Sequence, residues 1–128
     1  LFVKTVERAI ECPTTAVIFV PAPCISEWKF EDGETVAHAL VGAQCGVFPA
    51  FTWERGKGGK VLDCALAAGE RPPIEEFLAR QRRFQHLVRR DAATGAPAVQ
   101  PGREPAMEPL RAWVQENVER LHRLAELK

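Results

Sequence analysis

The chain carries an apolar, uncharged run, Thr15-Ala16-Val17-Ile18-Phe19-Val20, which is followed directly by Pro21-Ala22-Pro23-Cys24-Ile25-Ser26-Glu27-Trp28. The run is short, does not alternate with polar residues and is stopped by proline, a pattern that predicts a buried strand over 15–20. Pro21 and Pro23 hold the next residues extended and remove backbone donors. Cys24 is therefore expected on a stiff loop at the carboxyl end of a strand, where ligands and cofactors collect in α/β sheets.

The rest of the chain alternates helical and extended patterns. Helices are predicted where apolar residues recur on one face, and a helix opened by Pro72 and Pro73 carries acidic residues in its first turn. A glycine-rich turn over 55–59 predicts a hairpin. The predicted helices cover 2–11, 34–45, 72–83 and 107–127, and the predicted hairpin strands cover 47–54 and 60–63. This order predicts an α/β fold with a β-hairpin and C-terminal helices.

Three segments are expected along the chain. Residues 1–90 form one unit that includes the Cys24 loop. Residues 91–106 are rich in Ala, Gly and Pro without periodicity and are expected to be a linker or an ordered arm, and residues 107–128 form a C-terminal amphipathic helix. Six aromatic residues are suited to packing against further protein: Trp28, Phe51, Trp53, Phe77, Phe84 and Trp113.

Composition narrows the class of protein. The chain has 128 residues, of which 46% are hydrophobic and 27% charged, as expected of a globular chain. Its 17 basic residues balance its 17 acidic residues, which gives no support for binding nucleic acid or a membrane surface. No apolar run approaches a transmembrane span and no signal peptide is visible, so a cytoplasmic location is expected. The chain starts at Leu1, which suggests a fragment or a processed piece.

Four cysteines are present, and no two of them form a CxxC pair. Neither a zinc ribbon nor a self-contained iron–sulfur motif is therefore predicted. Cys12, Cys45 and Cys64 are expected to be small core residues, and a cytoplasmic setting argues against disulfides among them. Cys24 has three alternatives: a metal-cluster ligand, a structural thiol, or part of a mononuclear metal site shared with a histidine.

The histidines and arginines give weaker signals. His86 is expected to form a local hydrogen bond or a subunit contact, His38 lies in the core or at the surface, and His122 is solvated. A basic cluster is expected to be a solvated face, with acidic residues of a partner subunit as the next alternative and phosphate a distant third. Its members are Arg80, Arg82, Arg83, Arg89 and Arg90.

Two motifs in this order resemble one protein family. The first is Phe19-Val20-Pro21-Ala22-Pro23-Cys24 with Trp28, and the second runs from Pro73-Ile74-Glu75-Glu76-Phe77-Leu78 to Arg83-Phe84-Gln85-His86-Leu87. They resemble the carboxyl-terminal part of the thiamine-diphosphate-binding β subunit of 2-oxoacid:ferredoxin oxidoreductases, the pyruvate-type enzyme in particular. The family's loop typically reads Ser-Pro-Cys-Pro-Thr-Gly-Trp. The resemblance spans about residues 2–90 and the closing helix.

The resemblance implies a reaction and its cofactors. These enzymes convert a 2-oxoacid and coenzyme A to acyl-coenzyme A and CO2, and they pass electrons through iron–sulfur clusters to ferredoxin or an NAD-linked acceptor. The implied cofactors are thiamine diphosphate, Mg2+ and a [4Fe–4S] cluster beside the thiamine. Three of that cluster's cysteine ligands lie early in the family's subunit, and the fourth lies in the Pro-Cys loop, which here is Cys24. The implied partners are the other subunits of the enzyme.

This chain departs from the family pattern at several positions. Ile25 stands where the pyruvate-type loop often has proline, Ser26 and Glu27 replace Thr-Gly, and Arg82 replaces a glycine. The Gly-Asp-Gly signature for thiamine diphosphate and Mg2+ is absent from these residues, so the isolated chain is expected to be inactive. Which 2-oxoacid is used is left open between pyruvate and an aromatic 2-oxoacid. The alternative function is a non-catalytic module for subunit assembly in which the cysteines are structural.

Overall fold

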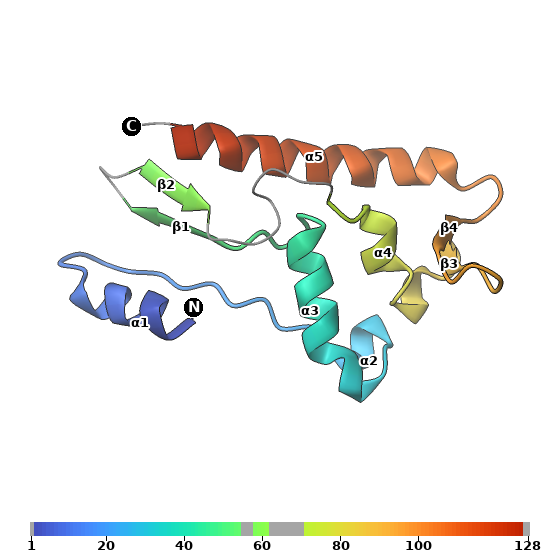
Figure 1. The fold of residues 1–128 in the computed structure, drawn as a ribbon, viewed down its shortest axis with the longest axis horizontal. Coiled ribbons are helices and arrows are strands. Elements are labelled where there is room, and N and C mark those ends of the chain that lie inside the picture. The colour runs from blue at the N-terminus through green and yellow to red at the C-terminus, as the bar shows by residue number, and fades with distance from the viewer. Residues whose placement is uncertain (1, 55–57, 62–70, 127–128) are drawn as a thin grey trace.

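The computed structural model describes residues 2–54, 58–61 and 71–126. A long helix, α5 (Glu104–Glu126), lies along one side, and α4 (Ile74–Leu78) lies beside α3 (Thr35–Gln44), with the end of α3 and α4 both facing α5 (Figure 1). The short helix α2 (Ile25–Trp28) packs at the far end of α3, while α1 (Phe2–Glu11) lies apart from α4 and α5. Among the described residues, no helix is both long and apolar enough to cross a bilayer.

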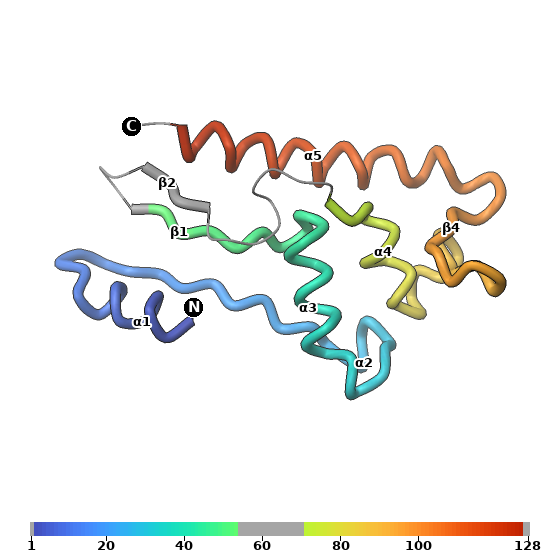
Figure 2. The backbone as a smooth tube through the Cα atoms, viewed as in Figure 1, coloured from blue at the N-terminus to red at the C-terminus, as the bar shows by residue number. Residues whose placement is uncertain are grey.

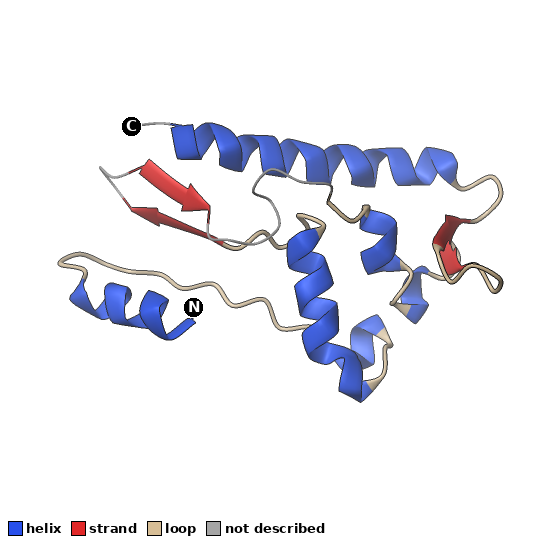
Figure 3. Cartoon of the chain, viewed as in Figure 1, coloured by secondary structure: helices blue, strands red, loops and turns tan. Residues whose placement is uncertain are grey.

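The described strands form two antiparallel pairs. β1 (Phe51–Glu54) pairs with β2 (Gly58–Val61), with Phe51 opposite Val61. β3 (Val88–Arg90) pairs with β4 (Pro97–Val99), with Val88 opposite Val99. The predicted hairpin is confirmed, but β1 begins four residues later than predicted and β2 begins at Gly58, inside the predicted turn 55–59. Residues 55–57 of that turn and 62–63 of the second predicted strand lie outside the described residues. The pair β3–β4 places regular structure inside the segment 91–106 that carried no sequence periodicity (Figure 3).

The core forms where α3, α4 and α5 meet. Phe77 and Leu78 of α4 pack against Met107 and Val114 of α5, and Cys45 follows α3. Met107 and Val88 are completely buried. Val114 and Val118 confirm the apolar stripe predicted for the last helix, since both are buried and lie one turn apart.

The predicted strand over 15–20 is not formed in this chain. Residues 14–24 run as an extended segment with no strand partner among the described residues (Figure 2). The side chains of Val17 and Phe19 are 68% and 89% exposed. A strand that is apolar on both faces needs neighbouring strands on both edges and covering layers on both faces, and the described residues supply neither.

The helix predicted over 72–83 is also shorter than expected. It ends at Leu78, and a short 3-10 turn, η2 (Arg82–Phe84), follows it. Gln81 adopts an extended backbone, and its side-chain amide donates to the Phe77 carbonyl oxygen at 3.3 Å. A buried side chain therefore satisfies a carbonyl that the next turn of helix would otherwise have bonded.

Candidate functional site

The segment around Cys24 contains Pro21 and Pro23 and is followed by a single helical turn, α2. Cys24 has an extended backbone and directly precedes α2, where the Trp28 N–H donates to the Cys24 carbonyl oxygen at 2.9 Å. The next residue, Lys29, ends the turn in the left-handed region with φ 56°. The exposed Cys24 thus lies where the extended segment meets α2, and one hydrogen-bonded turn joins it to Trp28.

The Cys24 thiol is exposed and its environment favours the thiolate. The Ser26 hydroxyl lies 3.4 Å from the sulfur, and this hydrogen bond lowers the Cys24 pKa, assisted by the backbone N–H groups of Glu27 and Ser26. The negative charge of Glu27 acts in the opposite direction and is the weakest influence. An exposed sulfur whose thiolate form is favoured by hydrogen bonds has the chemistry that an iron ligand needs.

Trp28 is held by an aromatic cluster at the base of the loop. Its ring stacks on Phe48 with centroids 6.0 Å apart and meets Phe77 edge-on at 5.8 Å. The Arg83 guanidinium lies over the same ring, 4.9 Å from its centroid, and 4.7 Å from the centroid of Phe84. The two family-like motifs, 55 residues apart at Trp28 and Arg83, therefore meet at this ring.

His38 lies inside the same cluster. It is completely buried and stacks on Phe30 with centroids 4.5 Å apart, while its two ring nitrogens have no hydrogen-bond partner among the described residues. Burial lowers the His38 pKa, and the positive charge of Arg80 adds to that effect. His38 is therefore a core residue, the first of the two locations that its sequence allowed.

The other cysteines differ in their surroundings. Cys45 is buried as predicted, and its thiol donates to the Pro73 carbonyl oxygen at 3.3 Å. Burial raises its pKa to about 11, so it remains a thiol at neutral pH. The core prediction for Cys12 is wrong, because Cys12 is exposed at the end of α1, a helix with no buried residue. Cys64 lies outside the described residues.

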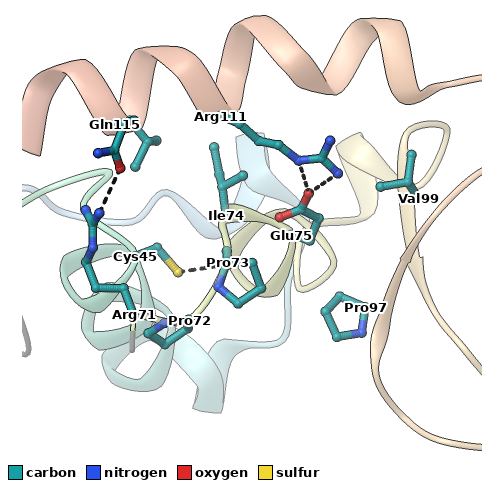
Figure 4. Close-up of a pocket in the computed structure, with 11 residues that line it drawn as sticks. Cys45, Arg71, Pro72, Pro73, Ile74, Glu75, Pro97, Val99, Arg111 and Gln115 are labelled. Atoms are coloured by element: carbon teal, nitrogen blue, oxygen red, sulfur yellow. Dashed lines mark hydrogen bonds and ion pairs between the residues drawn. The ribbon is translucent and has the colours of Figure 1, made fainter. Parts of the chain in front are cut away.

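A groove beside Cys45 is lined by polar side chains that pair with one another (Figure 4). It has a volume of about 660 Å3 and lies between α4 and α5. The Glu75 carboxylate accepts from Arg111 at 2.6 Å, and Arg71 donates to Gln115 at 2.9 Å. These pairs tie the segment around α4 to α5, so the groove's polar groups serve the packing of helices.

The predicted basic cluster is largely engaged within the chain. Arg82 pairs with Glu31, and Arg90 pairs with Glu76 at 2.7 Å. Arg89 donates to the Gln85 carbonyl oxygen at 2.9 Å. Arg82, Arg89 and Arg90 are nevertheless exposed, as is Arg83, so the predicted solvated face is confirmed for these four residues. Carboxylates of the same chain pair with two of them, Arg82 and Arg90.

The remaining histidines behave as the sequence predicts. The His86 ring lies 3.1 Å from the Arg83 carbonyl oxygen, which confirms the local hydrogen bond, and His122 is exposed on α5. Within the described part of the chain, no group of three or more His, Cys, Asp or Glu side chains is placed to hold a metal ion.

Sequence reasoning missed Gln81 and the role of Arg83. Gln81 is completely buried, and its carbonyl oxygen accepts from the Arg83 Nε at 2.8 Å. The signal available was the Gln-x-Arg-Phe spacing inside the second motif, which places both side chains at one turn. That spacing could not reveal Trp28 as the partner, because no local pattern links residues so distant in sequence.

Comparison with known proteins gives consistent relatives. The chain is 31% identical over 126 residues to the ketoisovalerate oxidoreductase subunit VorB of Pyrococcus abyssi, covering 98% of this chain and 35% of that protein. It is 27% identical over 126 residues to the pyruvate synthase subunit PorB of Thermotoga maritima, with 98% and 35% covered. It is 26% identical over 90 residues to PorB of Methanocaldococcus jannaschii, with 70% and 29% covered.

The chain spans about a third of the length of the curated relatives it matches. No family model matches the sequence, and no solved structure matches it. The relatives with the longest matches all carry the names of B subunits of 2-oxoacid oxidoreductases, and their similarity extends over nearly every residue of this chain. The chain belongs to the family of β subunits of 2-oxoacid:ferredoxin oxidoreductases.

Proposed function

We propose that the chain is the carboxyl-terminal part of the thiamine-diphosphate-binding β subunit of such an enzyme. The complete enzyme converts a 2-oxoacid and coenzyme A to acyl-coenzyme A and CO2 and delivers the electrons to ferredoxin or an NAD-linked acceptor. The names of the relatives support the substrate class, because they include both ketoisovalerate and pyruvate enzymes. The substrate choice therefore lies among small 2-oxoacids, with the branched one as a candidate beside pyruvate.

The contribution of this chain is one thiolate, Cys24. The observation that carries the proposal is the exposed sulfur of a cysteine that directly follows Pro21-Ala22-Pro23 and precedes α2, with the Ser26 hydroxyl 3.4 Å from the sulfur. A [4Fe–4S] cluster needs four thiolates and is tuned by amide donors to its sulfurs. Cys24 supplies one such ligand and already accepts backbone hydrogen bonds, so the donor chemistry fits. When bound, the cluster carries single electrons away from the thiamine diphosphate and Mg2+ centre.

The extended segment before Cys24 has a place in this proposal. Val17 and Phe19 point to alternate sides from Ile18 and Val20 in an extended chain, and all four are apolar. We assign 15–20 as a buried strand of the complete subunit's sheet, with its neighbours contributed by the remaining two-thirds of the subunit's length. That strand would bring Cys24 to the carboxyl edge of the sheet, where cofactors bind.

The central test is Cys24→Ser in the complete enzyme complex. We expect loss of iron from the proximal site and a fall of at least about 100-fold in electron delivery, because a hydroxyl is a poor ligand for a cluster iron. Iron analysis and reduction of ferredoxin with 2-oxoisovalerate and with pyruvate measure the two effects. Cys12→Ser, another exposed cysteine, is the matched control and should retain iron and activity. Full iron and normal electron delivery in Cys24→Ser would refute the role.

The second candidate is an assembly module without redox chemistry of its own. It is favoured by exposed aromatic side chains on β1 and α5, where Phe51, Trp53 and Trp113 are 50%, 56% and 48% exposed. Under this alternative, Cys24→Ser leaves the cluster intact while Trp53→Ser weakens association of the chain with the rest of the complex. Size-exclusion of the two variants separates the alternatives.

A further inference from the structure

The Cys24 sulfur is connected to the core through Trp28. One helical turn joins them, with hydrogen bonds from Trp28 N–H to the Cys24 carbonyl at 2.9 Å and from Lys29 N–H to the Ile25 carbonyl at 2.8 Å. Cys24 itself is exposed, and its sulfur lies 3.4 Å from the hydroxyl of Ser26, a residue of the same turn. The direction in which the sulfur points therefore depends on how firmly the Trp28 ring is held.

The Trp28 ring is held from several elements. Phe48 stacks on it with an interplanar angle of 12°, and Phe77 of α4 meets it at 83°. Phe48 follows α3 and Phe77 lies within α4, and both belong to the core, so they hold the Trp28 ring against it. The Trp28 indole is only half-buried. The charged Arg83 guanidinium, which can remain in contact with water, lies 4.9 Å from the ring centroid and makes a cation–π contact.

Arg83 is itself oriented by a buried chain of hydrogen bonds. Its Nε donates to the Gln81 side-chain oxygen at 2.8 Å, and Gln81, which is completely buried, donates to the Phe77 carbonyl at 3.3 Å. The backbone adds a second link, since the Arg82 N–H donates to the Lys29 carbonyl at 3.2 Å. A planar guanidinium can lie over a ring while its Nε–H donates in the plane of the group.

We propose that Trp28 and Arg83 are positioning residues for the Cys24 sulfur. The inference rests on the proposed function, because it assumes that Cys24 is a cluster ligand. The two motifs, although separated in sequence, then act together. The first contains the ligand Cys24, and Arg83 of the second holds the Trp28 ring in place, a contact that we call the clamp. The clamp sets the position of one thiolate and of the amides that bond it, and these determine cluster retention and reduction potential.

The test uses the complete enzyme complex with Arg83→Met and Trp28→Leu. Arg83 is exposed, so Arg83→Met removes the guanidinium, keeps an unbranched side chain and leaves the core intact. We expect a shifted reduction potential and altered EPR signature of the proximal cluster, and several-fold faster loss of iron to a chelator. Trp28→Phe retains a ring that can stack on Phe48 and should restore most of the wild-type values. Arg120→Met is the matched control, because Arg120 is exposed and pairs with Glu116 of the same helix, α5.

The outcomes separate the clamp from the proposed function. Wild-type potential, EPR signature and iron retention in both Arg83→Met and Trp28→Leu would overturn the positioning role. If Cys24→Ser alters the cluster while these variants do not, only the clamp fails. If Cys24→Ser also leaves the cluster unchanged, the ligand assignment fails with it. Assembly of each variant is checked by the size of the complex, so that a folding defect is recognised.

Discussion

His38 is a buried titratable group that the proposed chemistry does not use. Its ring is packed among Trp28, Phe30 and Phe77, where it behaves as one more aromatic side chain. The charged groups that influence it are Arg80 and Arg83, which disfavour its protonation, and Glu34, which favours it. Arg83 also lies over the Trp28 ring, so an imidazolium at His38 would repel the guanidinium that holds this ring.

This environment predicts acid-sensitive stability. Because the folded-state pKa of His38 lies below the unfolded value of 6.5, the unfolded chain takes up a proton that the folded chain refuses. The contribution of His38 to stability is complete above that value and is lost as the pH falls toward the folded pKa. Urea unfolding between about pH 8 and about pH 5 measures this, and His38→Leu should flatten the dependence. A slope unchanged in His38→Leu would contradict the assignment.

Gly46 is required by both backbone and space. It has φ +84°, and a Cβ there would lie 2.7 Å from the Val118 Cγ2 of α5. We expect Gly46→Ala to destabilise the chain by about 2–4 kcal/mol, the sum of left-handed strain and overpacking. Gly102→Ala, with φ +73° and no atom within 4 Å, should cost only about 1 kcal/mol. Gly33→Ala should change stability by less than about 0.5 kcal/mol.

Equilibrium urea unfolding followed by tryptophan fluorescence measures all three glycine variants. Gly102→Ala isolates the backbone strain, and Gly33→Ala controls for a methyl group added at an open position. Equal losses in Gly46→Ala and Gly102→Ala would show that the contact with Val118 does not limit packing.

Elements with a local signal were predicted well. The helices over 2–11 and 34–45 match α1 and α3 within a residue or two, because helical periodicity and a following breaker are local properties. The end of α4 was missed because the buried amide of Gln81 stops the helix from within its own turn. Pairing of β3 with β4 was missed because three-residue strands carry too little pattern.

The strand assignment for 15–20 leads to a further prediction. In the complete subunit, the amides of Val17 to Val20 should exchange with deuterium at least about 100-fold more slowly than in this chain by itself, because neighbouring strands would bond them. Mass spectrometry of the two forms measures the difference, with the α3 amides as an internal reference. Equally fast exchange in both forms would show that the segment stays outside any sheet.

The molecule as a whole divides into a packed part and an uncovered part. α3, α4 and α5 share a core, while α1 and residues 14–24 leave large apolar side chains exposed, among them Phe2, Ile10, Val17 and Phe19. Apolar surface of this extent is typical of a chain that packs against further protein. Phe19→Asp should therefore abolish incorporation of the chain into the complex, measured by co-purification, while Val36→Asp, at an exposed α3 position, serves as the control.

The amino-acid sequence by itself determined the local features: two amphipathic helices, the apolar run before a stiff cysteine loop, and motifs typical of one enzyme family. Short-range periodicity and proline geometry are properties of neighbouring residues, so they can be recognised without coordinates. Only the tertiary structure decided that Arg83 lies over Trp28, that Gln81 ends α4, and that His38 is buried. These contacts join residues that are distant in sequence or depend on side-chain packing, and the packing at one position depends on side chains from the whole chain.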